Sequence, residues 1–324
     1  MPAGLRRAGV ALVVALSSAA APANAGQAAA REAFVTNQAG DSLSIVDLAS
    51  GAAVSEIEIG GKPAGIAVAP DGRFAYLTSP ESKELVVVDA AKRTIASRFK
   101  VGEGPLGIAV HPAGDRVYVA DWYEHKLFVV DPAAGKVTGS VEVGQSPSGV
   151  AVTADGTRIL TADRDSDQIS IVDATTLART GSVPVGKRPF GVTVDAEGRR
   201  AYTANVASDD VSVIDLAAGK VVGTVKVGHR PYAVALSAGR AFVTNQYGGT
   251  VTVFDTSTLA VLETIEVGEY PEGIEADPAG GAVYVACWDA NTLERIDTAT
   301  LEVVSRIPVG NGPRAFGRFL RTAN

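Results

Sequence analysis

The stretches VGKRPFGVTV (185–194) and VGHRPYAVAL (227–236) share a frame in which Val-Gly is followed by two variable residues and a proline. This frame, with Val-Gly or Ile-Gly at its start, recurs along the chain at a step of 42 residues that shortens once to 40. A fixed period of this length indicates a repeat architecture. The prolines of the frame are Pro63, Pro105, Pro147, Pro189, Pro231, Pro271 and Pro313.

Two further residue series keep the same step, so the repetition is not accidental. One is an aspartate that closes an apolar run such as VVVD, and the other is an aromatic position in motifs such as FVTN. The aspartates are Asp47, Asp89, Asp131, Asp173, Asp215, Asp255 and Asp297. The second series is Phe34, Tyr76, Tyr118, Leu160, Tyr202, Phe242 and Tyr284.

Each repeat predicts four short strands. In one unit these are PFGVTV (189–194), RRAYTAN (199–205), DVSVIDL (210–216) and VVGTVKV (221–227). Alternation and β-branched residues favour strands, and clusters of Gly, Asp and Pro separate them as turns. Repeated four-stranded units of this length form the blades of a β-propeller. The sequence therefore predicts an all-β fold without helical segments in the mature chain.

The two ends of the chain predict how the ring closes. The first unit begins at its second strand, REAFVTN (31–37), and the chain ends with PRAFGRFL (313–320), which is a first strand without successors. We expect these segments to share one blade, because an open sheet edge invites aggregation. The result is a seven-bladed propeller that forms a single domain over residues 26–324.

The first 25 residues predict a cleavable signal peptide. Arg6 and Arg7 precede an apolar run over 8–16, and Ala23-Asn24-Ala25 offers a cleavage site. This run is too short to span a bilayer, and no later segment is a candidate transmembrane helix. We expect a periplasmic or secreted protein.

Charge and cysteine content narrow the possible partners. Removal of the two leader arginines changes the net charge from −7 to −9, which argues against nucleic acid as a partner. A single cysteine, Cys287, excludes an intramolecular disulfide. With only His111, His125 and His229 besides it, we expect no metal site and no cofactor, and we expect a monomer.

The motifs resemble those of the YVTN-repeat family of bacterial and archaeal propellers. FVTN at 34–37 and 242–245, YTAN at 202–205 and YVAD at 118–121 carry the resemblance, which extends over roughly 31–320. It implies an exported bacterial seven-bladed propeller, similar to the haem d1 domains of nitrite reductases. It leaves the activity open, because one fold hosts many functions.

The repeated polar residues are interpreted as structural. Each aspartate of the series precedes a turn, and its carboxylate can accept hydrogen bonds from the backbone amides of that turn. His111 lies in a turn (HPAGD) and is expected to cap or pack it. Cys287 replaces the Asn of the FVTN pattern and has no neighbouring His to activate it, so we expect a buried, inert thiol.

Function is expected where the repeats differ. Strand alternation places the Val-Gly-x-x-Pro connections and the loops after FVTN at one end of the ring, which we call the mouth. Basic and aromatic residues gather in these segments and predict a binding site for an anion. The candidates are Lys62, Trp122, Arg164, Lys187, Arg188, His229, Arg230, Tyr232, Trp288 and Arg314.

A structural explanation of the same residues stays open. The cations can simply pair with acids of the same rim, since exposed ion pairs are common and weak. The acids available for this are Glu103, Asp163, Glu269, Glu272 and Asp289.

Three functions follow from these patterns. The first is a non-catalytic binding propeller for an anionic small molecule or a periplasmic protein partner. The second is a lactonase-like or lyase-like enzyme in which His229 works with Glu269 or Glu272. The third is an accessory protein of a periplasmic quinone- or haem-dependent oxidation system, although the chain has no CxxCH haem motif.

Overall fold

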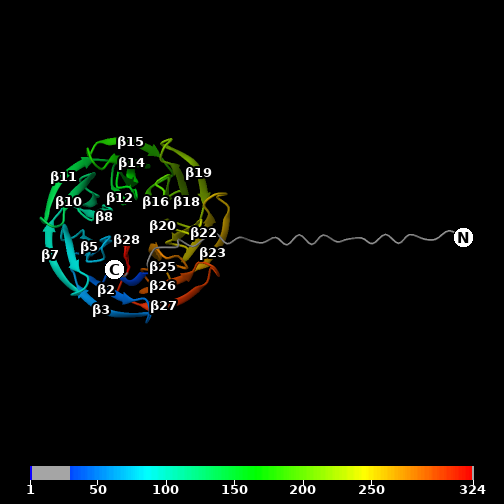
Figure 1. Ribbon diagram of the computed structural model, residues 1–324, viewed down its shortest axis with the longest axis horizontal. Helices are drawn as coiled ribbons and strands as arrows, with labels where there is room; N and C mark the ends of the chain where they lie inside the picture. Colours follow the sequence, from blue (N-terminus) through cyan, green and yellow to red (C-terminus); the bar gives the residue numbers. More distant parts are fainter. Residues whose placement is uncertain (2–29, 323–324) are drawn as a thin grey trace.

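Seven β-sheets stand like blades around a central axis in the computed structural model (Figure 1). The structure describes Met1 and residues 30–322, so the predicted leader lies outside the described residues apart from Met1. The only helical element between residues 30 and 322 is a 3-10 turn, η1 (Arg164–Ser166). That part of the chain also contains no helix with the length and apolar character needed to cross a membrane. The predicted all-β, seven-bladed propeller is confirmed.

Within each blade the chain runs outward through four antiparallel strands. The innermost strands are β4 (Gly65–Val68), β8 (Pro105–Val110), β12 (Pro147–Val152), β16 (Pro189–Val194), β20 (Pro231–Ser237) and β24 (Pro271–Ala276). The second strands are β1 (Ala30–Asn37), β5 (Phe74–Ser79), β9 (Val117–Asp121), β13 (Arg158–Asp163), β17 (Arg200–Asn205), β21 (Arg240–Asn245) and β25 (Ala282–Cys287). The third strands are β2 (Ser42–Asp47), β6 (Glu84–Asp89), β10 (Lys126–Asp131), β14 (Gln168–Asp173), β18 (Asp210–Asp215), β22 (Thr250–Asp255) and β26 (Thr292–Asp297). The outer strands are β3 (Ala52–Glu58), β7 (Thr94–Lys100), β11 (Lys136–Glu142), β15 (Arg179–Pro184), β19 (Lys220–Lys226), β23 (Val261–Glu266) and β27 (Val303–Pro308). We number the blades 1 to 7 in the order of their second strands.

The C-terminal segment closes blade 1, but not as the single strand 313–320 that the sequence predicts. It forms two short strands, β28 (Phe316–Arg318) and β29 (Leu320–Thr322), of which only β29 pairs with β1. From the Pro313–Asn37 bridge to the Leu320–Ala33 pair, the closing segment advances seven residues against four on β1. In blade 4 the equivalent advance is five, from Pro147 to Val152. The two extra residues push β28 off β1, and it pairs in parallel with β4 inside the ring.

The core lies between the blades, because each sheet packs both of its faces against its neighbours. One hydrophobic cluster, for example, joins Ile169 and Ile171 of β14 to Ile214 of β18. The predicted aromatic series is buried throughout, with Phe34 and Tyr118 fully inaccessible to solvent. Burying such side chains stabilises the fold by about 1.5–3 kcal/mol each.

The repeated aspartates close turns, as predicted. The Oδ1 atom of Asp173 accepts the amides of Thr175 and Thr176 at 3.0 and 2.7 Å, and the other six aspartates make equivalent bonds. In Asp255, hydrogen bonds from Ser257 and Thr258 lower the pKa of the carboxyl to about 2. Among the described residues, no three His, Cys, Asp or Glu side chains gather closely enough to hold a metal ion.

A series of four arginines clamps blades 3 to 7 to one another, and the sequence analysis did not identify it. Each side chain lies near the start of a second strand and donates to the backbone carbonyl just after the third strand of the following blade. The pairs are Arg116 with Ala174 (3.0 Å), Arg158 with Leu216 (3.0 Å), Arg200 with Thr256 (2.8 Å) and Arg240 with Thr298 (2.7 Å). These arginines keep the repeat step, so the signal was present in the sequence.

We predict that Arg158→Ala lowers the free energy of unfolding by about 1–3 kcal/mol. The variant loses two charge-assisted hydrogen bonds, to Leu216 O and Gly198 O, and leaves half-buried carbonyls without donors. Arg199→Ala is the matched control, since that side chain is 76 % exposed and its loss should change stability by less than about 0.5 kcal/mol. Urea unfolding followed by circular dichroism measures both; equal midpoints would contradict a clamp.

Candidate functional site

One residue from every blade fills the central channel just below the mouth. Each follows the proline of the frame, in the order Pro-x-Gly or Pro-x-Ala, and we call this set the plug ring. Its members are Ala64, Leu106, Ser148, Phe190, Tyr232, Glu272 and Arg314. The Phe190 and Tyr232 ring centroids lie 4.3 Å apart, and Phe316 of β28 packs 5.0 Å from Phe190. The central channel is therefore filled at this level.

The plug ring contains a buried polar network. The Arg314 Nε lies 3.2 Å from Glu272 Oε2, its Nη1 donates to Gln38 Oε1 at 2.9 Å, and its Nη2 donates to the Tyr232 hydroxyl. Glu272 Oε1 also accepts the side-chain amide of Gln246 at 2.6 Å. Burial raises the pKa of Glu272, and the Arg314 guanidinium offsets only part of that effect. Arg314 and Tyr232, both predicted as mouth residues, thus belong to the plug.

Three of the predicted cations line one groove between blades 4 and 5. Arg164, Lys187 and Arg188 surround a space of about 540 Å³ together with Asp165 and Asp167. Arg164 pairs with Asp165 at 2.6 Å and Lys187 pairs with Asp167 at 2.7 Å. No ion pair joins the exposed Arg188 side chain to a carboxylate within residues 30–322. We call this the mouth groove; it carries one uncompensated positive charge.

Asp167 fixes the backbone of this groove. Its Oδ1 accepts the amide of Arg188 at 2.8 Å, while its Oδ2 holds Lys187. Partial burial acts to raise the pKa of Asp167, but the bonds from Lys187 and Arg188 outweigh it and hold that pKa below its usual value. Arg188 itself has φ 55°, a left-handed conformation that is costly for any residue other than glycine.

His229 and Arg230 lie apart from the mouth groove, in an aromatic cluster between blades 6 and 7. The Arg230 guanidinium stacks 4.2 Å from the Tyr247 ring centroid and donates to its hydroxyl at 2.7 Å. His229 and Tyr270 both meet the edge of the same ring, at 5.6 and 5.4 Å. The carboxyl of Glu272 faces Gln246 and Arg314 instead. The hypothesis of a His229–Glu272 catalytic pair therefore finds no support in the contacts.

The other predicted mouth residues have local partners. Lys62 forms an ion pair with Asp41 at 2.6 Å. Trp122 is half-buried between the Arg164 guanidinium, 5.3 Å from its ring, and Phe190. Trp288 is also half-buried. Lys62 therefore pairs with an acid of the rim, as the structural explanation of the mouth residues predicts. The acid is Asp41, which is not one of those predicted.

One of the predicted rim acids and the lone thiol are buried in the blades. Asp163, predicted as a rim acid, is fully buried and accepts hydrogen bonds from Ser170 and the Gly144 amide. Cys287 is fully buried, and that burial, with the nearby Glu294 carboxylate, raises the pKa of the thiol. This agrees with the inert thiol expected from the sequence.

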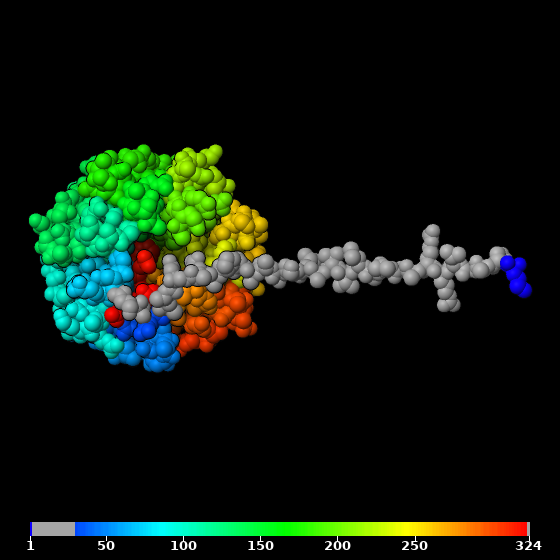
Figure 2. All heavy atoms as spheres, viewed as in Figure 1, coloured from blue at the N-terminus to red at the C-terminus, as the bar shows by residue number. Residues whose placement is uncertain are grey.

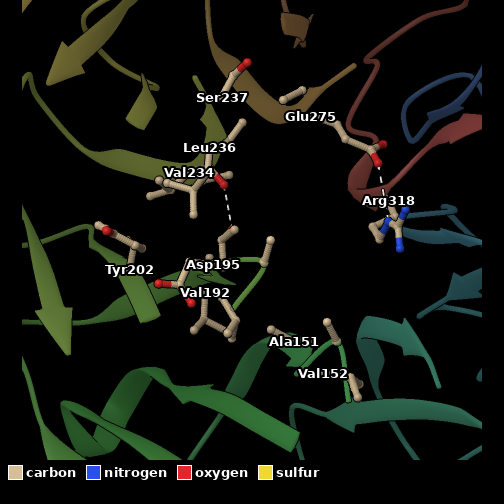
Figure 3. A pocket seen from close by; sticks show the side chains of 18 of the residues that line it. Ala151, Val152, Val192, Asp195, Tyr202, Val234, Leu236, Ser237, Glu275 and Arg318 are labelled. Carbon is tan, nitrogen blue, oxygen red and sulfur yellow. Dashed lines mark hydrogen bonds and ion pairs between the residues drawn. The ribbon is translucent and has the colours of Figure 1, made fainter. Parts of the chain in front are cut away.

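A large cavity occupies the ring on the other side of the plug. It has a volume of about 1720 Å³ and opens at the face that carries turns such as Pro70-Asp71-Gly72, opposite the mouth. Figure 2 shows the central hollow, with part of the C-terminal segment, in red, inside it. Figure 3 shows the Glu275–Arg318 pair on one wall, across from Val192, Val234 and Leu236.

Sequence reasoning missed this cavity, although the repeats contain its signal. The residue three positions after each member of the plug ring has a small side chain in most blades. The channel therefore stays wide at that level. These residues are Ala67, Ala109, Ala151, Thr193, Ala235, Glu275 and Gly317. Bulky side chains at one level and small ones at the next make a channel that is closed at one end.

Comparison with known protein families shows the family to which the chain belongs. The family model described as glutamine cyclotransferase matches residues 78–245, which is just over half of the chain. The chain belongs to the glutamine cyclotransferase family. The match covers blades 2 to 6 in whole or in part, including the mouth groove. No curated protein matches the chain, and the likeness to the YVTN-repeat family stays a resemblance of motifs.

Solved structures confirm the fold of this family member. Kuenenia stuttgartiensis hydrazine synthase has a TM-score of 0.71 at 21 % identity, covering 78 % of this chain and 88 % of that one. A functionally unknown protein from Desulfotomaculum acetoxidans has a TM-score of 0.79 at 14 % identity, covering 91 % and 100 %. Dihydro-heme d1 dehydrogenase NirN in complex with DHE has a TM-score of 0.67 at 18 % identity, covering 87 % and 74 %. At these identities the likeness shows the propeller fold alone.

The left-handed backbone of Arg188 generates a stability prediction. Arg188→Gly should raise the free energy of unfolding by up to about 1 kcal/mol, because glycine adopts φ 55° without a steric penalty. Arg188→Ala keeps that penalty and serves as the control, with stability close to the native chain. Thermal unfolding distinguishes them, and a glycine variant less stable than the alanine variant would contradict the prediction.

Proposed function

We propose that the protein is an exported, monomeric binding propeller that holds an anionic small molecule in the mouth groove. The observation that supports this most directly is the meeting of Arg164, Lys187 and Arg188 around one space. Two of the three cations have carboxylate partners, so a ligand anion would compensate the third. Export rests on the predicted leader over residues 1–25.

Arg188 is the residue we assign to the ligand anion. A guanidinium offers planar, paired donors that match a carboxylate or a phosphate. The exposed side chain is carried by a backbone whose amide is fixed by Asp167, so its base is held in place. The left-handed backbone at this position is shared by Lys62, Ser146, Arg230 and Tyr270 in other blades, so it belongs to the turn and presents whichever side chain stands there to the mouth.

Isothermal titration with citrate and with inorganic phosphate tests the proposal. We expect binding by the native protein, weakened about tenfold or more in Arg188→Gln, because the charge-assisted bonds to the anion are lost. Arg199→Gln removes a cation on the opposite face and should bind as the native protein does. Equal affinity of Arg188→Gln and the native protein would refute the site.

A second candidate function follows from the family, whose description names a glutamine cyclotransferase. In the cyclisation of an N-terminal glutamine, the α-amine attacks the side-chain carbonyl carbon, a ring C–N bond forms, and the amide nitrogen leaves as ammonia. Proton donation to that nitrogen favours its departure. Glu272 is the acid we assign to this role, because burial raises its pKa and its Oε1 already binds one carboxamide, that of Gln246, which a substrate would have to displace from the plug.

Incubation with a peptide that begins with glutamine tests this candidate by mass spectrometry. We expect loss of ammonia from the peptide, abolished in Glu272→Gln, which cannot donate an acidic proton. Gln246→Ala is the matched comparison, since it removes the carboxamide that occupies Glu272 and should not lower the rate. Equal activity of Glu272→Gln and the native protein would exclude this role of Glu272.

A further inference from the structure

The walls of the cavity below the plug combine apolar side chains of the inner strands with polar and charged groups nearer the opening. They are lined by branched side chains of the inner strands, among them Val150, Val152, Val192, Val194, Val234 and Leu236. Phe316 closes the inner end, where it packs against Phe190 and Tyr232 at 5.0 and 5.6 Å. The volume of about 1720 Å³ exceeds the roughly 300–1,000 Å³ of common small-molecule sites. The apolar part of a space of this size has room for a long apolar chain.

Most charged groups that line the cavity are already engaged. Three arginines, Arg158, Arg200 and Arg240, donate to backbone carbonyls in the inter-blade clamps. Arg199 faces Glu197 at 3.6 Å. Carboxylates at the opening accept hydrogen bonds from turn amides; these are Asp195, Asp215 and Asp277.

Arg318 differs from these groups. It lies on β28, two residues beyond Phe316 and therefore nearer the opening, and its side chain is 72 % exposed. Its one carboxylate contact among the described residues is Glu275, with Nε 3.5 Å from Oε1 (Figure 3). The other oxygen of Glu275 accepts the amides of Phe319 and Leu320 at 2.5 and 2.7 Å. The remaining donors of the Arg318 guanidinium are therefore available to a ligand.

We propose that the cavity binds an amphipathic carboxylate, with its apolar chain along the valine-lined walls toward Phe316 and its carboxylate on Arg318. The geometry sets the orientation of the ligand. The apolar end of the cavity lies at Phe316, and the exposed Arg318 guanidinium lies nearer the opening. This site lies on the opposite side of the plug from the mouth groove. It does not depend on the mouth-groove proposal or on the role proposed for Glu272.

The state of Glu275 supports the choice of an anionic head group. Burial raises the pKa of this carboxyl, and the nearby Arg318 and the two backbone amides offset part of that effect. Both oxygens of Glu275 are already engaged, one by Arg318 and the other by those two amides, so the carboxyl is not free to bind a cationic head group. An amphipathic cation on Glu275 would instead have to lie beside the Arg318 guanidinium, which repels it.

Isothermal titration with sodium dodecanoate, below its micelle concentration, tests the site. We expect one molecule bound per chain, with affinity about tenfold lower in Arg318→Gln because the charge-assisted bonds to the head group are lost. Ala151→Phe, a substitution on the half-exposed wall, should also weaken binding by filling the cavity, while circular dichroism checks that the variant is folded. Lys136→Gln, an exposed position on the outer strand β11, is the control and should bind dodecanoate as the native protein does.

Each contrary result would overturn a defined part of this inference. Unchanged affinity in both Arg318→Gln and Ala151→Phe would place dodecanoate outside the cavity and refute the site. Tighter binding of dodecylamine than of dodecanoate would refute the anionic head group. No binding of dodecanoate would refute the proposal as a whole, whereas loss of citrate binding in Arg188→Gln concerns only the mouth groove.

Discussion

The structure depends on the meeting of the two ends of the chain in blade 1. Without β29 on β1, the ring would keep an unpaired inner edge and the plug would lose one of its seven members. Ion pairs from Glu32 to Arg93 and Arg321 and the bonds from Glu275 to the Phe319 and Leu320 amides hold this closure. Closure therefore fixes the position of every blade around the axis, and with it both candidate sites.

The same closure makes the two ends of the channel chemically different. Two additional residues in the closing segment direct β28 into the ring, where Phe316 joins the aromatic plug and Arg318 faces the cavity. On the mouth side, charged side chains surround shallow features such as the mouth groove. On the other side, walls that are partly apolar enclose a space of about 1720 Å³. One scaffold thus offers two sites of different character, separated by a packed layer of side chains.

The repeated frame tolerates this diversity because its own requirements are few. The glycine leaves room for the polar side chain that ends the second strand: a Cβ on Gly186 would lie 2.5 Å from Asn205 Nδ2. The proline begins the inner strand, and the two residues between them face the mouth. Lys187 and Arg188 or His229 and Arg230 can occupy these positions without changing the blade. Family membership and fold therefore determine the architecture of the ring, but they leave its ligand largely open.

The sequence alone determined the blade number, the order of strands, the turn aspartates and the residues that vary at the mouth, because strand pairing and turns are local and repeat with one period. It placed the closing strand but not its displacement onto β4, which depends on a bulge of two residues. Only the tertiary structure decided which variable residues meet. Arg314 and Glu272 join across blades, Arg230 stacks on Tyr247, and Arg164, Lys187 and Arg188 share a groove. Side-chain direction and packing around the axis govern those meetings, and because these residues differ from blade to blade, the periodic pattern does not predict their partners.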